Sequence, residues 1–289
     1  MEAPTGVIDS HLHLWSLASP FHQWPGPDLA AIHRDFGVGE LATLSPRLAG
    51  VVLVQAQPDA RETEWLLNIA ETQSLVLGVV GWTMFDAPDA ADAVARLARR
   101  NKLVGLRPML QDMADQRWIL GSGPGKAIAA MVEHGLCFDA LVRPRHLPAI
   151  RELALRWPDL RIVIDHGAKP AMSSRMLDPW RADMAALAEL PNVWCKLSGL
   201  LTELPCNSPA TMIAPHVRHL VELFGARLMW GSDWPVLTLA SCNYAEWMSL
   251  SAELVHQIGV ADTRSVYTSA VQRFYGLPSV NASLVIEAG

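Results

Sequence analysis

The sequence predicts an α/β fold, a (β/α)8 TIM barrel that forms a single domain over residues 1–289. Short apolar runs, each about the length of one strand, recur eight times, and a helical stretch follows each of them. Polar and apolar residues do not alternate within these runs, which is typical of parallel strands covered on both faces. An open doubly wound sheet is the competing architecture, but eight strand–helix repeats without a linker favour the closed barrel.

The eight strands are expected within residues 6–15, 48–57, 75–83, 103–109, 135–144, 161–170, 192–200 and 227–235. Helical patterns fill the gaps, and the clearest lies in the seventh gap, between Pro209 and Gly225. Its apolar stripe consists of Ile213, Val217, Leu220, Val221 and Phe224. His216 and His219 fall beside or outside this stripe, so we expect both side chains in solvent.

The composition argues against several classes of partner. The 23 Lys and Arg residues are scattered among 29 Asp and Glu residues, so neither nucleic acid nor an anionic membrane surface is a natural partner. No apolar run approaches the roughly 18 residues of a membrane span, and the first 15 residues do not resemble a secretion signal. Four widely spaced cysteines predict free thiols and a cytoplasmic protein. A homo-oligomer remains open.

Polar side chains gather at the C-terminal ends of the predicted strands, where TIM-barrel enzymes carry their catalytic groups. In chain order they are His11, His13, Gln55, Gln57, Trp82, Thr83, Arg107, Asp139, Arg143, Asp165, His166, Lys169, Lys196, Ser198, Ser232 and Asp233. A strand that is apolar along its length and polar only at its end places reactive groups over a filled core. We therefore expect these side chains to surround one barrel mouth.

The first predicted strand carries two imidazoles, in the segment VIDSHLHLW at residues 7–15. Side chains at positions i and i+2 of a strand face the same way, so His11 and His13 should both point into the mouth. A lone histidine at such a place is more often a hydrogen-bonded core residue. Because His166 and Asp233 converge on the same mouth from two other strands, a functional site is favoured here.

This pattern resembles the amidohydrolase superfamily of metal-assisted hydrolases, which share an HxH, a later His and a final Asp at strand ends. The segments IDSHLHLW, VQAQ, GLRP, IDHGAKP, CKLSGL and WGSDWP together resemble the sugar-lactonase branch, which holds L-fuconolactonase and L-rhamnonolactonase. The resemblance extends from residue 6 to about residue 277. Six motifs in order are specific for the family, although not for one substrate.

The resemblance implies no metal or one divalent metal ion. Binuclear members need a bridging carboxylated Lys or Glu at the fourth strand and a His at the fifth. Here the fourth strand ends at Arg107, and His146 lies beyond Pro144, where the next helix should start. The residues left to bind one ion are His11, His13, His166 and Asp233. Three imidazoles and one carboxylate suit Zn²⁺, and metal-free catalysis stays open.

Hydrolysis of a lactone, a cyclic ester, needs a deprotonated water, a polarised carbonyl and a proton for the leaving ring oxygen. Asp233 is the candidate general base. Its carboxylate can accept the proton if burial raises its own pKa or if a cation lowers the pKa of the water. His11, His13 and His166 are candidates to stabilise the oxyanion, as hydrogen-bond donors or through a bound ion.

Sugar hydroxyls need polar partners beside an apolar floor. The candidates for hydrogen bonding are Arg107, Lys169, Gln55 and Gln57, and those for stacking on the sugar ring are Trp24, Trp82 and Trp234. Some have structural alternatives, because Arg107 could pair with a carboxylate such as Asp139, and Lys169 and Lys196 could be rim charges. The segment 21–29, which follows the first strand, could form part of a lid.

The sequence therefore predicts a hydrolase that opens the ester ring of a small-molecule aldono- or deoxy-aldono-lactone, such as L-fuconolactone. Two other enzymes remain open as alternatives. A muconolactone or pyrone-carboxylate lactonase would use Arg107 to hold a substrate carboxylate, and a decarboxylase of the same superfamily would depend on a divalent metal. A non-catalytic binding protein is disfavoured, because the buried charge of Asp233 would need compensation without giving any catalytic benefit.

Overall fold

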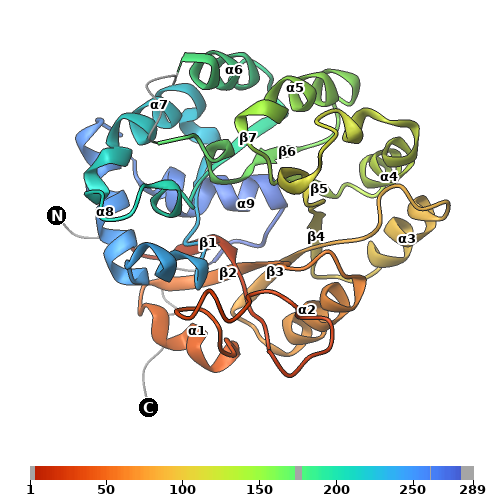
Figure 1. The fold of residues 1–289 in the computed structure, drawn as a ribbon, viewed down its shortest axis with the longest axis horizontal. Coiled ribbons are helices and arrows are strands. Elements are labelled where there is room, and N and C mark those ends of the chain that lie inside the picture. Colours follow the sequence, from red (N-terminus) through yellow and green to blue (C-terminus); the bar gives the residue numbers. More distant parts are fainter. Residues whose placement is uncertain (1–3, 173–177, 261, 281–289) are drawn as a thin grey trace.

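The computed structural model describes residues 4–172, 178–260 and 262–280. Eight parallel strands follow one another in chain order around a barrel, with helices outside it (Figure 1), as the sequence predicts. The strands are β1 Val7–Leu12, β2 Leu48–Val54, β3 Val76–Gly81, β4 Leu103–Leu106, β5 Cys137–Ala140, β6 Ile162–Ile164, β7 Val193–Leu197 and β8 Leu228–Trp230. Each of them lies inside its expected range, so the predicted (β/α)8 barrel is confirmed.

The helices that cover the barrel are α1 Val38–Leu44, α2 Ala60–Thr72, α3 Ala90–Leu97, α4 Ser122–Glu133, α5 Leu147–Arg156, α6 Asp178–Ala188, α7 Ala214–Phe224 and α8 Tyr244–Gln257. One prediction about α7 is wrong. His216 is buried, and its ring packs against Trp180 of α6 at a centroid distance of 5.5 Å, because α6 covers this side of α7. His219, also expected in solvent, is only partly exposed, because its ring packs against Trp180 at 5.3 Å. No described helix is long and apolar enough to cross a membrane.

The seam between β1 and the segment after β8 closes the barrel. Leu12 pairs with Trp234, the backbone N–H of Asp233 donates to the carbonyl of His11 at 2.8 Å, and that of His13 donates to the carbonyl of Trp234 at 2.8 Å. These bonds join the first and last strand segments of the chain. The backbone bonds of the seam alone therefore fix the positions of the two histidines of β1 relative to Asp233.

The buried carboxyl group of Asp9 reinforces this seam. Its Oδ1 atom accepts the backbone N–H of His11 at 3.1 Å and that of Ser232 at 2.9 Å. Burial raises the pKa of the Asp9 carboxyl to about 6. Gly231 allows the close approach of the two segments, because a Cβ atom there would lie 2.8 Å from the Cβ of His11.

The two ends of the barrel differ. Helix α9, Ala270–Tyr275, lies across the end farther from the viewer in Figure 1. It packs against apolar side chains of the strands, namely Ile8, Val52, Val54, Val80, Cys137, Val163 and Met229. The phenol of Tyr275 reaches the barrel interior and donates to Oδ2 of Asp139 at 2.7 Å. Since α9 fills this end, the opposite end is the one that can hold a cavity.

Candidate active site

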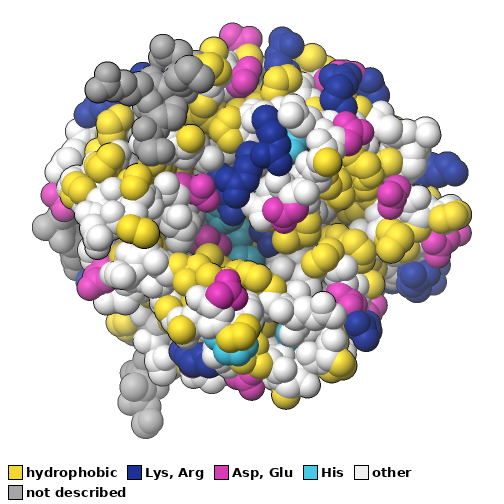
Figure 2. All heavy atoms as spheres, viewed as in Figure 1, with side chains coloured by type: hydrophobic (Ala, Val, Ile, Leu, Met, Phe, Trp, Pro, Cys, Tyr) yellow, Lys and Arg dark blue, Asp and Glu magenta, His cyan; other side chains and the backbone are white. Residues whose placement is uncertain are grey.

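A cavity of about 300 Å³ opens at the C-terminal ends of the strands. Its walls are formed by His13, Trp24, Ala56, Gln57, Pro58, Arg107, Met109, Gln111, Asp112, Leu141, His166, Lys169, Asp233 and Val236. Figure 2 shows histidine side chains at the bottom of a central hollow on this face. Catalytic residues of TIM-barrel enzymes lie at this end of the fold.

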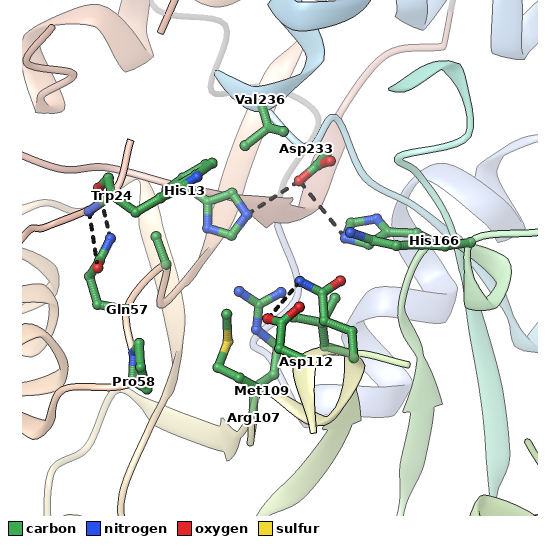
Figure 3. Close-up of a pocket in the computed structure, with 14 residues that line it drawn as sticks. His13, Trp24, Gln57, Pro58, Arg107, Met109, Asp112, His166, Asp233 and Val236 are labelled. Carbon is green, nitrogen blue, oxygen red and sulfur yellow. Dashed lines mark hydrogen bonds and ion pairs between the residues drawn. The ribbon is translucent and has the colours of Figure 1, made fainter. Parts of the chain in front are cut away.

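Asp233 lies at the centre of the predicted histidine set. Its Oδ1 atom is 3.2 Å from Nε2 of His13, 3.7 Å from Nε2 of His11 and 3.9 Å from Nε2 of His166. Figure 3 shows the contacts with His13 and His166. Burial opposes ionisation, but the surrounding imidazoles outweigh it and hold the pKa of the Asp233 carboxyl below its usual range. The structure thus brings together all four residues that the sequence placed at one mouth.

The tautomer of His13 follows from its second nitrogen. Nδ1 lies 2.7 Å from the carbonyl oxygen of Val54, so Nδ1 carries the proton and Nε2 presents a lone pair to the site. That lone pair faces Oδ1 of Asp233, which is also an acceptor, and it lies 3.2 Å from Nε2 of His11. Acceptor atoms that face one another without a proton between them are typical of a cation site.

This donor set fits one divalent metal ion. One ligand atom from each of His11, His13 and Asp233 can be chosen so that all lie within 4.8 Å of one another, and the same is true of His11, Asp165 and His166. Imidazole nitrogens and carboxylate oxygens are ligands that Zn²⁺ accepts. The grouping of His11, His13 and Asp233 agrees with the expectation of one divalent ion, whereas His166, the fourth expected ligand, groups instead with His11 and Asp165.

His166 occupies a sharp turn after β6. Its backbone has φ of +54°, and its Nδ1 atom lies 2.8 Å from the hydroxyl of Ser198. A glycine is required opposite this ring, because a Cβ atom at Gly199 would lie 2.4 Å from Nδ1 of His166. Burial lowers the pKa of His166 to about 4, so the ring is neutral at pH 7.

A second group of charged side chains lies beneath the cavity. We call Asp139, Asp165 and Lys196 the buried charge layer, because all three are fully buried and none of them lines the cavity. Nζ of Lys196 lies 2.5 Å from Oδ2 of Asp139, 3.1 Å from Oδ1 of Asp165 and 3.1 Å from Nδ1 of His11. The interpretation of Lys196 as a rim charge is therefore wrong. The side chain of Lys196 projects from β7 into the barrel interior, where it is fully buried.

His11 and Arg107 connect this layer to the cavity. Burial and the nearby Lys196 ammonium keep the pKa of His11 well below its usual range. Nη1 of Arg107 lies 3.3 Å from Nε2 of His11 and 3.3 Å from Oδ2 of Asp165, so its carboxylate partner is Asp165 and not Asp139. Asp165 stands at a strand end in the sequence, but local pattern gave no reason to assign it a role.

Two other candidates for substrate binding differ in their surroundings. Lys169 lines the cavity, and its Nζ atom is 4.0 Å from a carboxylate oxygen of Glu203. Gln55 is fully buried and does not line the cavity. Its Nε2 atom donates to the backbone carbonyl of Arg107 at 2.8 Å, and the backbone carbonyl of Gln55 accepts a hydrogen bond from the Arg107 guanidinium. The described contacts of Gln55 thus orient Arg107.

The three tryptophans are not equivalent. Trp24 lines the cavity, whereas Trp82 and Trp234 do not. Trp234 is 6% exposed and packs against Phe36 at a centroid distance of 5.1 Å. The backbone N–H and carbonyl of Trp82 both bond to the hydroxyl of Thr63, which holds this residue against α2. Of the three stacking candidates, only Trp24 lines the cavity.

Several wall residues were not assigned a role from the sequence. They are Ala56, Pro58, Met109, Gln111, Asp112, Leu141 and Val236. All of them follow strands, in turns or short 3-10 segments such as Leu110–Asp112 and Val236–Ala240. Their only common signal is a place within a few residues of a strand end, which does not determine where a loop side chain points.

Comparison with known proteins connects this site to a family. The amidohydrolase family model matches residues 8–277. The chain is 45% identical over 275 residues to the L-fucono-1,5-lactonase of Burkholderia ambifaria, an alignment that covers 93% of this chain and 94% of that protein. It is 34% identical over 288 residues to the L-fucono-1,5-lactonase of Burkholderia multivorans, with coverage of 94% and 96%.

A solved structure agrees with these relatives. The crystal structure of an amidohydrolase from Burkholderia multivorans with bound zinc superposes with a TM-score of 0.86 at 32% identity, covering 94% of this chain and 99% of that chain. The predicted resemblance to the amidohydrolases and to their sugar-lactonase branch is confirmed by these matches. This chain belongs to the amidohydrolase family.

Proposed function

We propose that this protein hydrolyses the ring ester of a sugar lactone, with L-fucono-1,5-lactone or a close relative as its substrate. The observation that carries the proposal is the ionised carboxylate of Asp233, which faces three imidazoles at the bottom of the cavity. The volume of about 300 Å³ is at the small end of ligand pockets and suits a single sugar ring. The relatives named above supply the substrate class.

Asp233 is the proposed general base. Its pKa is held below the usual range, so burial does not make it a stronger base, and the water must be acidified instead. A divalent ion held by His11, His13 and Asp233 would lower the pKa of water and polarise the lactone carbonyl. Asp233 accepts the proton of the attacking water and returns it to the alkoxide that leaves when the ring opens.

His166 is the proposed donor to the carbonyl oxygen. Its ring is neutral at pH 7, and the hydroxyl of Ser198 can donate to Nδ1 at 2.8 Å, which places the ring proton on Nε2. Nε2 lies at the Asp233 side of the cavity. A fixed donor at that position stabilises the negative charge that develops on the carbonyl oxygen.

The substrate contacts follow from the cavity wall. Trp24 offers an apolar face to the sugar ring, and Lys169 offers a cation whose side chain is 18% exposed and can move to reach a hydroxyl. Arg107 also reaches the wall, but its guanidinium already contacts Asp165 and the carbonyl of Gln55. Because the guanidinium already has these two partners, Arg107 is poorly placed to pair with a substrate carboxylate. This disfavours the muconolactone and pyrone-carboxylate alternative.

The test is proton release in weak buffer with a pH indicator, measured on a panel of aldono- and deoxy-aldono-1,4- and 1,5-lactones. Rapid acid release from L-fucono-1,5-lactone or L-galactono-1,5-lactone is expected. The same assay after chelator treatment, and again after Zn²⁺ is restored, decides whether the ion takes part. If no sugar lactone on the panel gives acid release and a muconolactone or a carboxylated aromatic is turned over, the proposal is overturned.

A further inference from the structure

The loop between β1 and α1 carries Trp24. The side chain of Gln57, in the loop between β2 and α2, makes two hydrogen bonds to the backbone of Trp24. Gln57, which is 4% exposed, donates from Nε2 to the carbonyl of Trp24 at 2.7 Å and accepts the N–H of Trp24 on Oε1 at 3.3 Å. Figure 3 shows the two bonds. The amide thus pairs with Trp24 as a neighbouring strand would, and this double pairing fixes the orientation of the amide.

Gln57 is itself held by α2. Glu62, which is fully buried, accepts the backbone N–H of Gln57 at 2.7 Å and that of Ala56 at 2.9 Å. His22 of the same loop as Trp24 has its Nε2 atom 3.3 Å from Glu62. On its other side, Nδ1 of His22 lies 3.0 Å from the backbone nitrogen of Ser16 and 3.1 Å from its carbonyl oxygen. The loop is therefore anchored at two points that lie two residues apart.

Aromatic packing supports the ring of Trp24. The rings of Trp24 and Trp15 meet edge to face at a centroid distance of 5.2 Å, and Trp15 meets Phe36 at 5.2 Å. Phe36 in turn packs against Trp234 at 5.1 Å. Trp15, Phe36 and Trp234 are all buried, so this stack is part of the core. Trp234, a stacking candidate from the sequence, therefore supports Trp24 from behind.

We propose that Gln57 is a positioning residue that holds Trp24 as a fixed wall of the sugar site, and that the segment 21–29 is not a lid. The inference rests on the proposed function, because the wall has a role only if a ring stacks on Trp24. An indole that is already in place costs no ordering when the lactone binds. Loss of the amide pairing then weakens substrate binding without changing the reacting groups.

The experiment is a double-mutant cycle on Trp24→Ala and Gln57→Leu with the lactone that the native enzyme hydrolyses best. Gln57→Leu is expected to raise KM about tenfold while kcat stays within about twofold, the signature of lost uniform binding. In the Trp24→Ala background, Gln57→Leu should add less than about twofold, because its effect passes through the indole. Gln257→Leu, an exposed glutamine of α8 outside the cavity wall, is the matched control.

Two results of the cycle would overturn the inference. If Gln57→Leu lowers kcat alone, or if it adds its full effect to Trp24→Ala, Gln57 acts on the substrate directly. If Gln57→Leu does not fold, Gln57→Glu takes its place in the cycle. It keeps an acceptor for the N–H of Trp24 but sets a carboxylate against the carbonyl of Trp24, so it should show the same rise in KM.

Hydrogen exchange separates this inference from the proposed function, since it needs no turnover. The N–H of Trp24 is expected to be protected in the native protein and to exchange much faster in Gln57→Leu, and protection across 21–29 should not change when lactone or its hydrolysed acid is added. Fast exchange of this N–H in the native protein, or strong protection gained on binding, would show a lid. A native enzyme that hydrolyses no sugar lactone contradicts the proposed function. The exchange rate of the Trp24 N–H still decides whether Gln57 holds Trp24 in place.

Discussion

The cavity floor and the buried charge layer contain the same kinds of side chain and differ in whether these border the cavity. In the layer, Nζ of Lys196 lies 2.5 to 3.1 Å from Oδ2 of Asp139, Oδ1 of Asp165 and Nδ1 of His11, and neither Lys196 nor the two carboxylates line the cavity. On the floor, Asp233 has imidazoles at 3.2 to 3.9 Å and also borders the cavity. The first arrangement is closed off from solvent, whereas the second is open to a water or an ion from the cavity.

Position along the strand explains part of this difference. Asp139 and Lys196 lie within β5 and β7, so their side chains project into the closed interior. His166 and Asp233 follow the last residues of β6 and β8, where the backbone turns away and opens the cavity. Asp165 also follows β6 directly but is fully buried, so the direction of the side chain decides the role together with its position along the strand.

The largest expected effect tests the floor. Asp233→Asn should lower kcat about a thousandfold or more, because the amide cannot accept the proton of water. The thermal midpoint should change by only a few degrees, since Asn retains the shape of the side chain. Steady-state kinetics by proton release, with circular dichroism for the fold, make the measurement. A variant with near-native turnover would remove Asp233 from the role of base.

The second prediction tests the layer. Lys196→Met should reduce the free energy of unfolding by about 3 kcal/mol or more, because it leaves buried carboxylates without their ammonium partner. The double variant Asp139→Asn with Lys196→Met should recover part of the loss, since Asp165 keeps Arg107 at 3.3 Å. Urea unfolding compares the three proteins. A loss below about 1 kcal/mol in Lys196→Met, or no recovery in the double variant, would contradict the stabilising pairing of Lys196 with the buried carboxylates.

A buried carboxyl without a cation sharpens the comparison through its pH dependence. No salt bridge to Asp9 is found within the described ranges, and burial raises its pKa to about 6 in the folded state. The unfolded chain has released this proton by about pH 4, so the native protein loses stability as pH rises from about 4 to 6. Asp9→Asn should remove this loss and retain the acceptor for the two backbone N–H groups.

For Asp9→Asn the measured quantity is the difference in free energy of unfolding between variant and native protein. This difference should move in favour of the variant by about 2 kcal/mol between pH 4.5 and pH 7. Urea titrations at three pH values suffice. A difference that stays constant with pH would mean that the carboxyl ionises in the folded state as it does in the unfolded chain.

The smallest effect concerns Arg107, which touches both regions. Arg107→Met should lower kcat/KM on hydroxyl-rich lactones about tenfold, because it removes the cation that holds Asp165 and contacts His11. Trp82→Phe is the control, since that residue does not line the cavity, and its kcat/KM should stay within about twofold. Equal kinetics for Arg107→Met and the native enzyme would exclude Arg107 from the site.

Local pattern was enough to predict the barrel and the centre of the site. Apolar runs of strand length give the positions of all eight strands, and the period of two residues puts His11 and His13 on one side. The rule that barrel enzymes carry their chemistry at strand ends then brings His166 and Asp233 to the same mouth. These inferences depend on backbone periodicity and on the direction of parallel strands, which neighbouring residues in the chain define.

The partners of each side chain depended on the closed fold. Lys196 meets Asp139 and His11 because the alternate strands β5, β7 and β1 project side chains into one interior, a relation set by strand register and barrel closure. Trp24 lines the cavity while Trp234 supports it from the core, because the path of the loop after β1 decides which indole faces the substrate. His216 is buried by α6 for the same reason. Contacts between segments distant in the chain arise from packing, which no local spacing encodes.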